Sequence, residues 1–348
     1  MILETEMQRP TIPDLAKAAG VSVATVNRVL SGAQIVRQQT LQRVQEAAEA
    51  INFYGTGTIQ ARVAASRPKY RLGFLLHQPN RSFYRDLGAA LALEAKAVAD
   101  ADVDARIEFL EDLSPQNISA RLLDLGETCD AIAVVAAVHP LVSETLDILR
   151  ARDVPIFALV SQLSATGQVH YVGLDNWKVG RTAAWAIEKI SKAPGKLGIL
   201  VGNHRYRCQE MNESGFRSYF REYAPEFTLL EPLLTFESST IAQEMTEKLL
   251  REHPDLTGLY VAGGGITGAL TALRNSDRAG KIVVIGYQLM EVTRAALLDG
   301  TMTVAISHPL KLMAQETVAG MMRACASRSG GGNWTSIIPF DIYTRENI

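Results

Sequence analysis

The chain has 348 residues, of which 47% are hydrophobic and 21% are charged, a composition typical of a globular protein with two or three folding units. Its longest purely apolar stretch, Ala131 to Val138, is far below the roughly 20 residues that span a bilayer, and its first ten residues include acids where a signal peptide is apolar. Three scattered cysteines support neither a disulfide framework nor a structural metal site. We therefore expect a cytoplasmic protein without a membrane segment, metal or cofactor.

Charge is distributed unevenly along the chain, although the net charge is only −2. Between Arg9 and Lys69, eight basic residues stand against three acidic ones, a net charge of +5, so the remainder carries −7. A small basic segment beside a large acidic body is typical of nucleic-acid binding, because phosphate contacts and counterion release drive that affinity. Charge alone leaves a merely solvated basic surface open as the alternative.

Capping residues predict a first helix in this basic segment. Thr11 is an N-cap candidate, because Pro13 lies in the first turn and Asp14 stands at the third helical position. Gly20 then ends the helix.

A second helix begins at the N-cap Ser22, and its apolar residues recur at three- and four-residue spacing: Val26, Val29 and Leu30. This periodicity leaves four residues outward, free to contact a partner: Val23, Ala24, Asn27 and Arg28. A third helix is predicted from about Gln39 to Ile51. Two helices joined by a tight turn, with a third packed behind, form the helix-turn-helix plan, in which the second helix enters the major groove of DNA.

The segment from Gly55 to Pro68 contains two glycines and mixes alanine, serine and arginine. Such a composition predicts a hinge or linker with at most a marginal helix. The boundary between two domains is expected here.

From Arg71 onward, apolar runs alternate with amphipathic segments. Continuous apolar strands between helices indicate parallel sheets that are buried on both faces. The runs are Leu72–Leu76, 131–138, Ile156–Val160, Leu197–Val201, Leu259–Ala262 and Ile282–Ile285. About ten such units exceed what one open sheet usually holds, so we expect two doubly wound subdomains. Ligands in this architecture bind at the carboxyl ends of strands or in a domain cleft.

Residues 11–30, TIPDLAKAAGVSVATVNRVL, resemble the head of the LacI/GalR family of bacterial transcription regulators, with Asn27 in place of the usual serine. The body is similar to the periplasmic-binding-protein-like effector domain of that family. The similarity includes Asn80 to Tyr84, Val172 to Asn176 and the pair Gly180 and Arg181.

This resemblance implies a domain organisation. Residues 10–54 are expected to form the DNA-binding domain, residues 55–70 the hinge, and residues 71–348 the effector-binding and dimerisation domain. Within that domain we expect an N-subdomain of about residues 71–162 and 302–330 and a C-subdomain of about residues 163–301 and 331–348.

The resemblance also implies DNA contacts. Val23, Ala24 and Arg28 are expected at base edges, where arginine bonds guanine bidentately. Ser22, Thr25 and Asn27 are expected at phosphates, and Thr11 is also expected to contact the DNA. The family places a leucine wedge where this chain has Arg62. Because a charged guanidinium does not replace an apolar wedge, we expect Arg62 in the minor groove or along phosphates.

Effector contacts are expected near the cleft, although Val160, Ser161, Asn212 and Gln288 replace polar or charged groups that sugar-binding relatives use. An ordinary hexose is therefore less expected than another carbohydrate-like effector. The candidates are Asn80, Phe83, Tyr84, Ser161, Gln162, Arg205, Arg207, Asn212, Gly264, Gln288 and His308. His204, Arg205, Arg207 and His308 favour an acidic effector such as a sugar acid, and ordinary surface placement is the alternative for each.

An enzyme is the competing hypothesis, because Gly263 to Gly268 spells GxGxxG between a strand and a helix. An NAD-dependent oxidoreductase, however, needs an acid at the end of the next strand, and that strand ends in Tyr287 and Gln288. A cytosolic small-molecule binding protein without DNA function is the second alternative. We predict instead a non-enzymatic homodimeric repressor of a pseudo-palindromic operator, controlled by a sugar, sugar acid or polyol between its subdomains.

Overall fold

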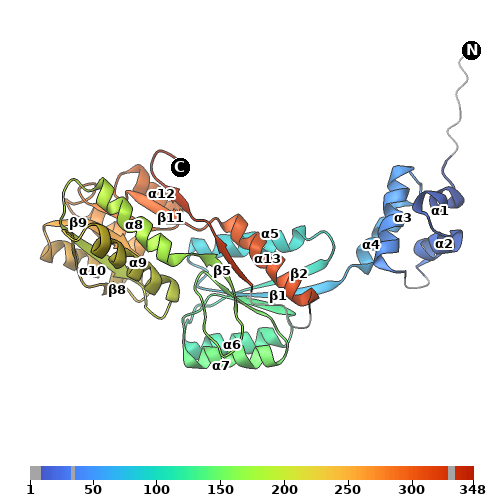
Figure 1. The fold of residues 1–348 in the computed structure, drawn as a ribbon, viewed down its shortest axis with the longest axis horizontal. Coiled ribbons are helices and arrows are strands. Elements are labelled where there is room, and N and C mark those ends of the chain that lie inside the picture. The colour runs from blue at the N-terminus through green and yellow to red at the C-terminus, as the bar shows by residue number, and fades with distance from the viewer. Residues whose placement is uncertain (1–8, 33–35, 328–333) are drawn as a thin grey trace, which may run out of the picture. The chain divides into compact units, whose positions relative to one another are not determined.

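The computed structural model describes residues 9–32, 36–327 and 334–348 (Figure 1). It divides into two compact units: Met1–Tyr70 with Val98–Asp104, and Arg71–Ala97 with Ala105–Ile348. We name the helical part, residues 9–66, the head, and the chain from Lys69 onward, where the first strand begins, the body. Across the described ranges, the helices are too short or too polar to cross a membrane.

The head contains the three predicted helices and a fourth. They are α1 (Ile12–Ala19), α2 (Val23–Ser31), α3 (Gln38–Ala50) and α4 (Thr56–Ser66). Leu15, Val26 and Val44 are fully buried where the first three helices meet, and Phe53 joins the same core. The apolar periodicity of the sequence therefore predicts the faces that pack together in the head.

Helix α4 lies in the segment that the sequence predicts as a hinge or linker. Ile59 and Val63, one helical turn apart, are buried in the head core. The Thr56 hydroxyl donates to the carbonyl of Phe53 at 2.6 Å, and Gln60 Nε2 donates to Glu49 Oε1 at 3.0 Å. Gly57, within α4, lowers the helix propensity of this segment by about 1 kcal/mol, whereas Gly55 is the N-cap. Packing of the apolar pair offsets that cost, because tertiary contacts supply most helical stability in proteins.

The first lobe of the body is a six-stranded sheet in the order β12-β5-β4-β3-β1-β2. Its strands are β1 (Lys69–Leu76), β2 (Asp102–Phe109), β3 (Ala131–Val134), β4 (Ile156–Leu159), β5 (His170–Leu174) and β12 (Thr335–Ile338). Helices α5 (Ser82–Ala97) and α13 (Leu310–Ala326) lie side by side on one face, and α6 (Pro115–Gly126) and α7 (Pro140–Ala151) cover the other (Figure 1).

The second lobe is a sheet in the order β13-β11-β10-β9-β6-β7, with β8 also pairing with β6. Its strands are β6 (Lys196–Val201), β7 (Thr228–Leu229), β8 (Leu233–Leu234), β9 (Leu256–Val261), β10 (Val283–Tyr287), β11 (Val304–Ser307) and β13 (Asp341–Tyr343). Its described strand pairs are parallel except β11 with β13. The predicted pair of parallel sheets is therefore present.

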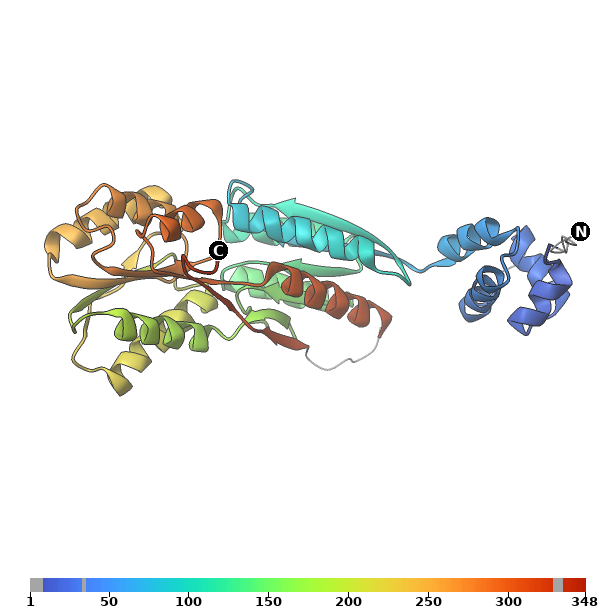
Figure 2. The same ribbon diagram turned by 90° about the horizontal axis from the view of Figure 1, so that it is seen from above.

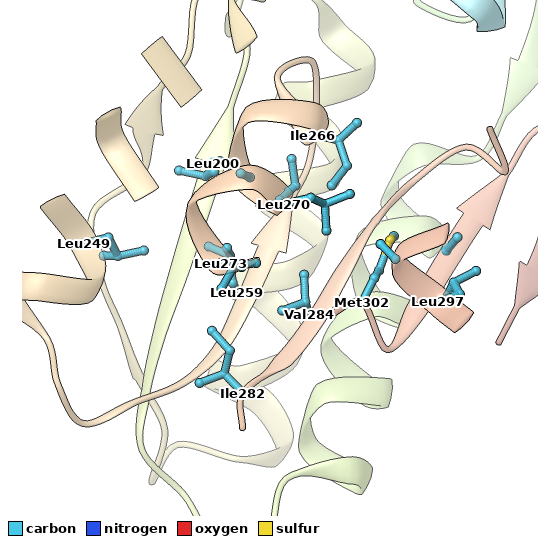
Figure 3. Packing of buried hydrophobic residues seen from close by; sticks show 14 of the residues in the cluster. Leu200, Leu249, Leu259, Ile266, Leu270, Leu273, Ile282, Val284, Leu297 and Met302 are labelled. Atoms are coloured by element: carbon cyan, nitrogen blue, oxygen red, sulfur yellow. The ribbon is translucent and has the colours of Figure 1, made fainter. Parts of the chain in front are cut away.

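Helices cover both faces of the second sheet (Figure 2). One face carries α10 (Ser239–Glu252), α11 (Ile266–Arg274) and α12 (Glu291–Leu298), whose apolar side chains form a core with β9 and β10 (Figure 3). The opposite face carries α8 (Asn176–Ile190) and α9 (Arg207–Tyr223), where Phe216 stacks on Tyr260 of β9. Burial on both faces explains why these strands are continuous apolar runs.

The structure corrects the predicted subdomain boundaries. Strands β5 and β12 belong to the first sheet and β11 to the second, whereas the sequence analysis places each of them in the other subdomain. The chain therefore passes between the lobes three times, after β5, after β11 and after β12. A short apolar run does not specify which of two sheets it joins, because both sheets offer the same buried environment.

Helices α8 and α9 approach each other closely at two glycines. A Cβ on Gly180 would lie 2.0 Å from the backbone oxygen of Asn212, and one on Gly215 would lie 2.3 Å from the backbone oxygen of Trp177. A helix backbone does not move aside as a flexible side chain does. The contact between α8 and α9 therefore depends on the absence of a side chain at both positions.

We expect Gly180→Ala to lower the free energy of unfolding by about 1–3 kcal/mol, because the two helices must separate to admit the methyl group. Gly57→Ala is the matched control, since a Cβ at that helical glycine meets nothing within 4 Å. That control should leave stability unchanged or raise it by up to about 1 kcal/mol through helix propensity. Chemical unfolding monitored by circular dichroism measures both, and equal effects of the two substitutions would contradict the packing argument.

Candidate functional site

The turn between α1 and α2 is fixed by backbone conformation and by α3. Gly20 adopts a left-handed φ of 62°, which a side chain disfavours, and so reverses the chain after α1. Arg43 of α3 donates through Nη2 to the carbonyls of Ala19 and Gly20 at 2.7 and 3.0 Å. Ser22 then caps α2, since its hydroxyl oxygen accepts from the Thr25 amide at 3.2 Å. These contacts set the direction in which α2 leaves the turn.

The outward face of α2 carries most of the residues predicted to contact DNA. Val26 and Val29 point into the core, and Thr25 is half-buried. The exposed residues of this face are Ser22, Val23, Ala24, Asn27 and Arg28. Thr11 is also exposed, at the start of α1, and its hydroxyl donates to Asp14 at 2.6 Å. The Thr11 amide also donates to this carboxylate at 2.8 Å. The two hydrogen bonds from Thr11 lower the pKa of the Asp14 carboxyl, which remains ionised at the start of α1.

Arg62 lies on α4 and contacts the end of the second helix. Its Nη2 donates to the carbonyl of Ser31 at 3.1 Å, and a Cβ on Gly32 would lie 2.3 Å from its Cζ. Arg62 thus satisfies a carbonyl in the last turn of α2, where a positive charge is favourable. In this arrangement it connects α4 to α2 within the head.

A cavity of about 780 Å³ lies between the two lobes of the body. Its wall contains seven of the residues that the sequence predicts for the effector site: Asn80, Phe83, Tyr84, Asn212, Gly264, Gln288 and His308. A second cavity of about 1060 Å³ lies at the amino ends of β9 and β10. Ligand sites in parallel sheets lie at the carboxyl ends of strands, so the cavity between the lobes is the candidate site.

Four predicted effector residues do not line this cavity. Ser161 is fully buried and accepts from the Cys208 amide at 3.4 Å, whereas Gln162 is exposed. Arg205 is exposed, and Arg207 is exposed with a bond to Ser164 Oγ at 3.3 Å. His204, which the sequence analysis also names as favouring an acidic effector, lies outside the cavity, where its Nε2 and Glu213 Oε2 are hydrogen-bonded at 2.6 Å.

The structure adds wall residues that the sequence analysis does not name as effector contacts. Several of them lie within two residues of the end of a strand, and this position is a signal that could have identified them: His77 and Gln78 after β1, Glu111 after β2 and Asn176 after β5. Others precede α5, lie at the beginning of α9 or lie in the turn before α10: Arg81, Tyr206, Gln209 and Glu237. Strand ends alone do not predict this second group.

Aromatic rings form much of the wall. His77 lies 4.9 Å from Tyr84 and 5.4 Å from Tyr206 between ring centroids, and Phe83 lies 5.5 Å from His308. Burial raises the pKa of the Tyr84 and Tyr206 hydroxyls, which therefore remain protonated and able to donate hydrogen bonds. Flat apolar faces with a few polar groups are typical of small-molecule sites.

One ring nitrogen of the wall residue His308 is buried and lacks a hydrogen-bond partner among the described residues. Gln288 Oε1 accepts from the Ser307 hydroxyl at 3.1 Å and the His308 amide at 3.2 Å, which fixes the orientation of its side-chain amide. Gln288 Nε2 then donates to His308 Nδ1 at 2.6 Å, so the ring proton lies on Nε2. Among the described residues, His308 Nε2 has no hydrogen-bond partner.

Four wall residues other than glycine have a left-handed backbone: Val160 (φ 64°), Phe236 (φ 49°), Glu237 (φ 62°) and Gln288 (φ 66°). Such conformations cost of order 1–3 kcal/mol each and persist only where surrounding contacts enforce them. Strain of this kind concentrates at binding sites, which independently supports this cavity as the functional one.

The buried His308 predicts a specific pH dependence of stability. Burial lowers the pKa of its imidazole to about 3, against about 6.5 in an unfolded chain. Below pH 6.5 the unfolded state therefore binds a proton that the folded state does not, and folding loses about 1.4 kcal/mol per pH unit. We expect His308→Gln to make the free energy of unfolding less dependent on pH between 6.5 and 5. Urea unfolding at several pH values measures this, and identical slopes would contradict it.

The head and the body each match a family model. Residues 11–55 match the model of bacterial regulatory proteins of the lacI family, and residues 73–329 match the periplasmic binding protein domain. Among solved structures, an ABC transporter solute-binding protein from Burkholderia graminis in complex with D-arabinose has a TM-score of 0.74 at 18% identity, covering 81% of this chain and 98% of that one. A glucose-galactose binding protein, GanP from Geobacillus stearothermophilus, has a TM-score of 0.73 at 16% identity, covering 81% and 99%. They confirm the predicted fold of the body.

Curated relatives include both regulators and binding proteins. The lactose operon repressor of Escherichia coli is 25% identical over 98% of this chain and 91% of its own length. The ribose operon repressor of Bacillus subtilis is 25% identical over 83% of each chain. A D-apiose import binding protein of Paraburkholderia graminis is 24% identical, and the match spans 64% of its length and 57% of this chain. The chain therefore belongs to the lacI family of bacterial regulatory proteins and is a DNA-binding transcriptional regulator whose body is a periplasmic binding protein domain.

Proposed function

We propose that the head binds operator DNA through the outward face of α2, and that a small neutral sugar or polyol in the cavity between the lobes controls this binding. The exposed face of a capped helix carrying Arg28 is the observation that carries the DNA half. Arg28 Nε donates to the Ala24 carbonyl at 3.3 Å, which holds the side chain along the helix and leaves its two terminal nitrogens available. Those nitrogens match the paired acceptors of guanine.

The charge of the cavity supports a neutral effector over a sugar acid. The cations that favoured an acidic ligand, Arg205 and Arg207, lie outside the wall, and the wall contains the acids Glu111, Asp112 and Glu237. Burial lowers the pKa of the wall histidine His77 to about 4, so this ring is uncharged near neutral pH. Relatives named for ribose, D-apiose and lactose support a carbohydrate in the same position.

Two copies of the chain would place two heads on the half-sites of a pseudo-palindromic operator, which is why we propose a homodimer acting as a repressor in the cytoplasm. The effector acts by binding one arrangement of the two lobes more tightly than another, and only this difference in affinity can shift operator binding. The groups that we propose as DNA contacts are those of the α2 face, with Thr11, Thr25 and Arg62 beside them.

We expect Arg28→Ala to weaken operator binding by about 1–3 kcal/mol and to relax base preference at one position of each half-site. Lys17→Ala removes the same charge from an exposed position on α1 and is the matched control. That control should leave the base preference unchanged, because loss of a charge outside the α2 face can alter only the general attraction to phosphates, which carries no base information. Selection of binding sites from random duplexes measures both, and an unchanged preference in Arg28→Ala would overturn its role.

We expect one or more neutral sugars or polyols to raise the melting temperature of the protein, because a ligand that binds only the folded state stabilises it. His308→Phe keeps a ring at this position and removes the donor at Nε2. This variant should therefore bind the ligand less tightly, by about 1–2 kcal/mol in binding free energy. Arg205→Ala, outside the cavity, is the control and should leave the affinity unchanged. Calorimetric titration of the three proteins measures this, and stabilisation by sugar acids alone would contradict the proposed ligand class.

A further inference from the structure

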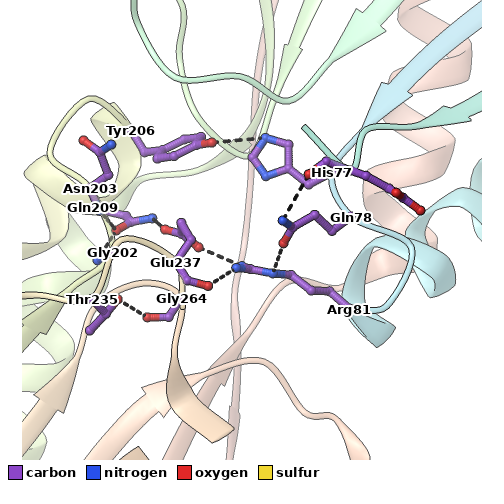
Figure 4. Close-up of polar contacts among 11 residues, drawn as sticks. His77, Gln78, Arg81, Gly202, Asn203, Tyr206, Gln209, Thr235, Glu237 and Gly264 are labelled. Atoms are coloured by element: carbon purple, nitrogen blue, oxygen red, sulfur yellow. Dashed lines mark hydrogen bonds and ion pairs between the residues drawn. The ribbon is translucent and has the colours of Figure 1, made fainter. Parts of the chain in front are cut away.

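An ion pair joins the two lobes inside the cavity (Figure 4). Arg81 immediately precedes α5 in the first lobe, and Glu237 lies in the turn between β8 and α10 of the second. Arg81 Nη1 donates to Glu237 Oε2 at 2.7 Å, and Nη2 donates to the backbone carbonyl of the same residue. The two side chains are only 24% and 12% exposed. This pair is therefore shielded from the solvent that weakens surface ion pairs.

Residues of the second lobe surround the Glu237 carboxylate closely and fix its position. Gln209 Nε2 donates to Glu237 Oε1 at 2.6 Å, while Gln209 Oε1 accepts from the Gly202 amide at 2.7 Å, which fixes the orientation of the glutamine. A Cβ on Gly202 would lie 1.9 Å from Glu237 Oε1, and one on Gly264 would lie 1.9 Å from Oε2. The carboxylate thus lies between two glycine backbones, with one donor from each lobe.

The surrounding chain holds both partners of this pair in position. Gln78 Oε1 accepts from Arg81 Nε at 3.1 Å, and Gln78 Nε2 donates to the carbonyl of Glu111 at 3.3 Å. On the other side, Phe236 and Glu237 both have a left-handed backbone, which is unfavourable for residues with side chains. The contacts of the carboxylate therefore stabilise a turn that the local sequence does not favour.

This pairing determines which charges the cavity offers to a ligand. Among the described wall residues, Arg81 is the only lysine or arginine, and its guanidinium is already bound to Glu237. An effector carboxylate would find no available cation and would meet the acids Glu111 and Asp112 at the rim. Burying a charge without a partner is unfavourable, so such an effector is rejected.

We propose that Glu237 permanently occupies a carboxylate subsite formed by Arg81, Gln209 and the glycines around it, and thereby excludes acidic effectors and links the lobes before any effector binds. The selection of effectors rests on the proposed function. The subsite itself does not, because its parts are present whether or not the cavity binds a sugar.

The variant Glu237→Gly tests this directly. Glycine suits the left-handed backbone at this position, and its introduction leaves Arg81 and Gln209 facing an empty subsite. We expect formate, titrated against chloride at constant ionic strength, to raise the melting temperature of this variant by about 2–4 °C at ten times its Kd. The wild-type protein should show no such rise, because its own carboxylate fills the subsite.

Two further proteins make the result specific. Glu111→Gln removes a carboxylate from the exposed rim of the same cavity but leaves Glu237 in the carboxylate subsite, so the melting temperature of this variant should not respond to formate. Glu237→Gly combined with Arg81→Met should lose the response, since the cation is gone. A formate effect of equal size in all four proteins, or none in a Glu237→Gly protein that retains its circular dichroism spectrum, overturns the proposal.

Small-angle scattering measures the link between the lobes. Without effector, Glu237→Gly should have a larger radius of gyration than the wild type, and formate should reverse the increase. If Glu237→Gly does not fold, Glu237→Gln decides the matter, because it keeps the shape of the side chain but removes its charge. An unchanged scattering curve for that variant overturns the link. Neither the melting temperature with formate nor the scattering curve involves DNA or sugar. Both results therefore test the subsite separately from the proposed regulation, which is tested by operator and sugar binding.

Discussion

The parallel direction of the strands is the constraint on which the site depends. Because the described strand pairs of both sheets are parallel, except β11 with β13, the carboxyl ends of the parallel strands gather at one edge of each sheet, and both edges meet the same cavity. His77 and Val160 follow strands of the first sheet, while Gln288 and His308 follow strands of the second. Residues more than 200 positions apart thus share one wall without any local sequence signal connecting them.

Much of this arrangement could be predicted from the sequence. Apolar runs such as Leu72–Leu76 and Leu197–Val201 are strands because burial on both faces requires continuous apolar residues, and the capping residues Thr11 and Ser22 mark helix starts. Which of the two sheets contains β5, β11 or β12 could not be predicted, since strands of both sheets have the same apolar composition. The linker assignment underestimated α4, because its propensity is low and its stability comes from packing.

The functional residues also divide into those that could be identified from the sequence and those that could not. Asn212 and Gln288 could be identified because their positions follow from the resemblance to a family, and both line the cavity. Arg205 and Arg207 were selected for their chemistry, but they lie at the start of α9 with their side chains exposed. Glu237 carries no local sign of its role, because its left-handed turn contains no glycine and its partner Arg81 is 156 residues away. Only three-dimensional contacts reveal such a pair.

The three passages of the chain between the lobes have a consequence for how regulators of this type diversify. Three connections join the two lobes and restrict how one lobe can move relative to the other. Under the proposed mechanism, a ligand of the cavity acts through this restricted motion, whatever its chemistry. The wall can therefore acquire new side chains, and with them a new effector, while the connections between the lobes stay the same.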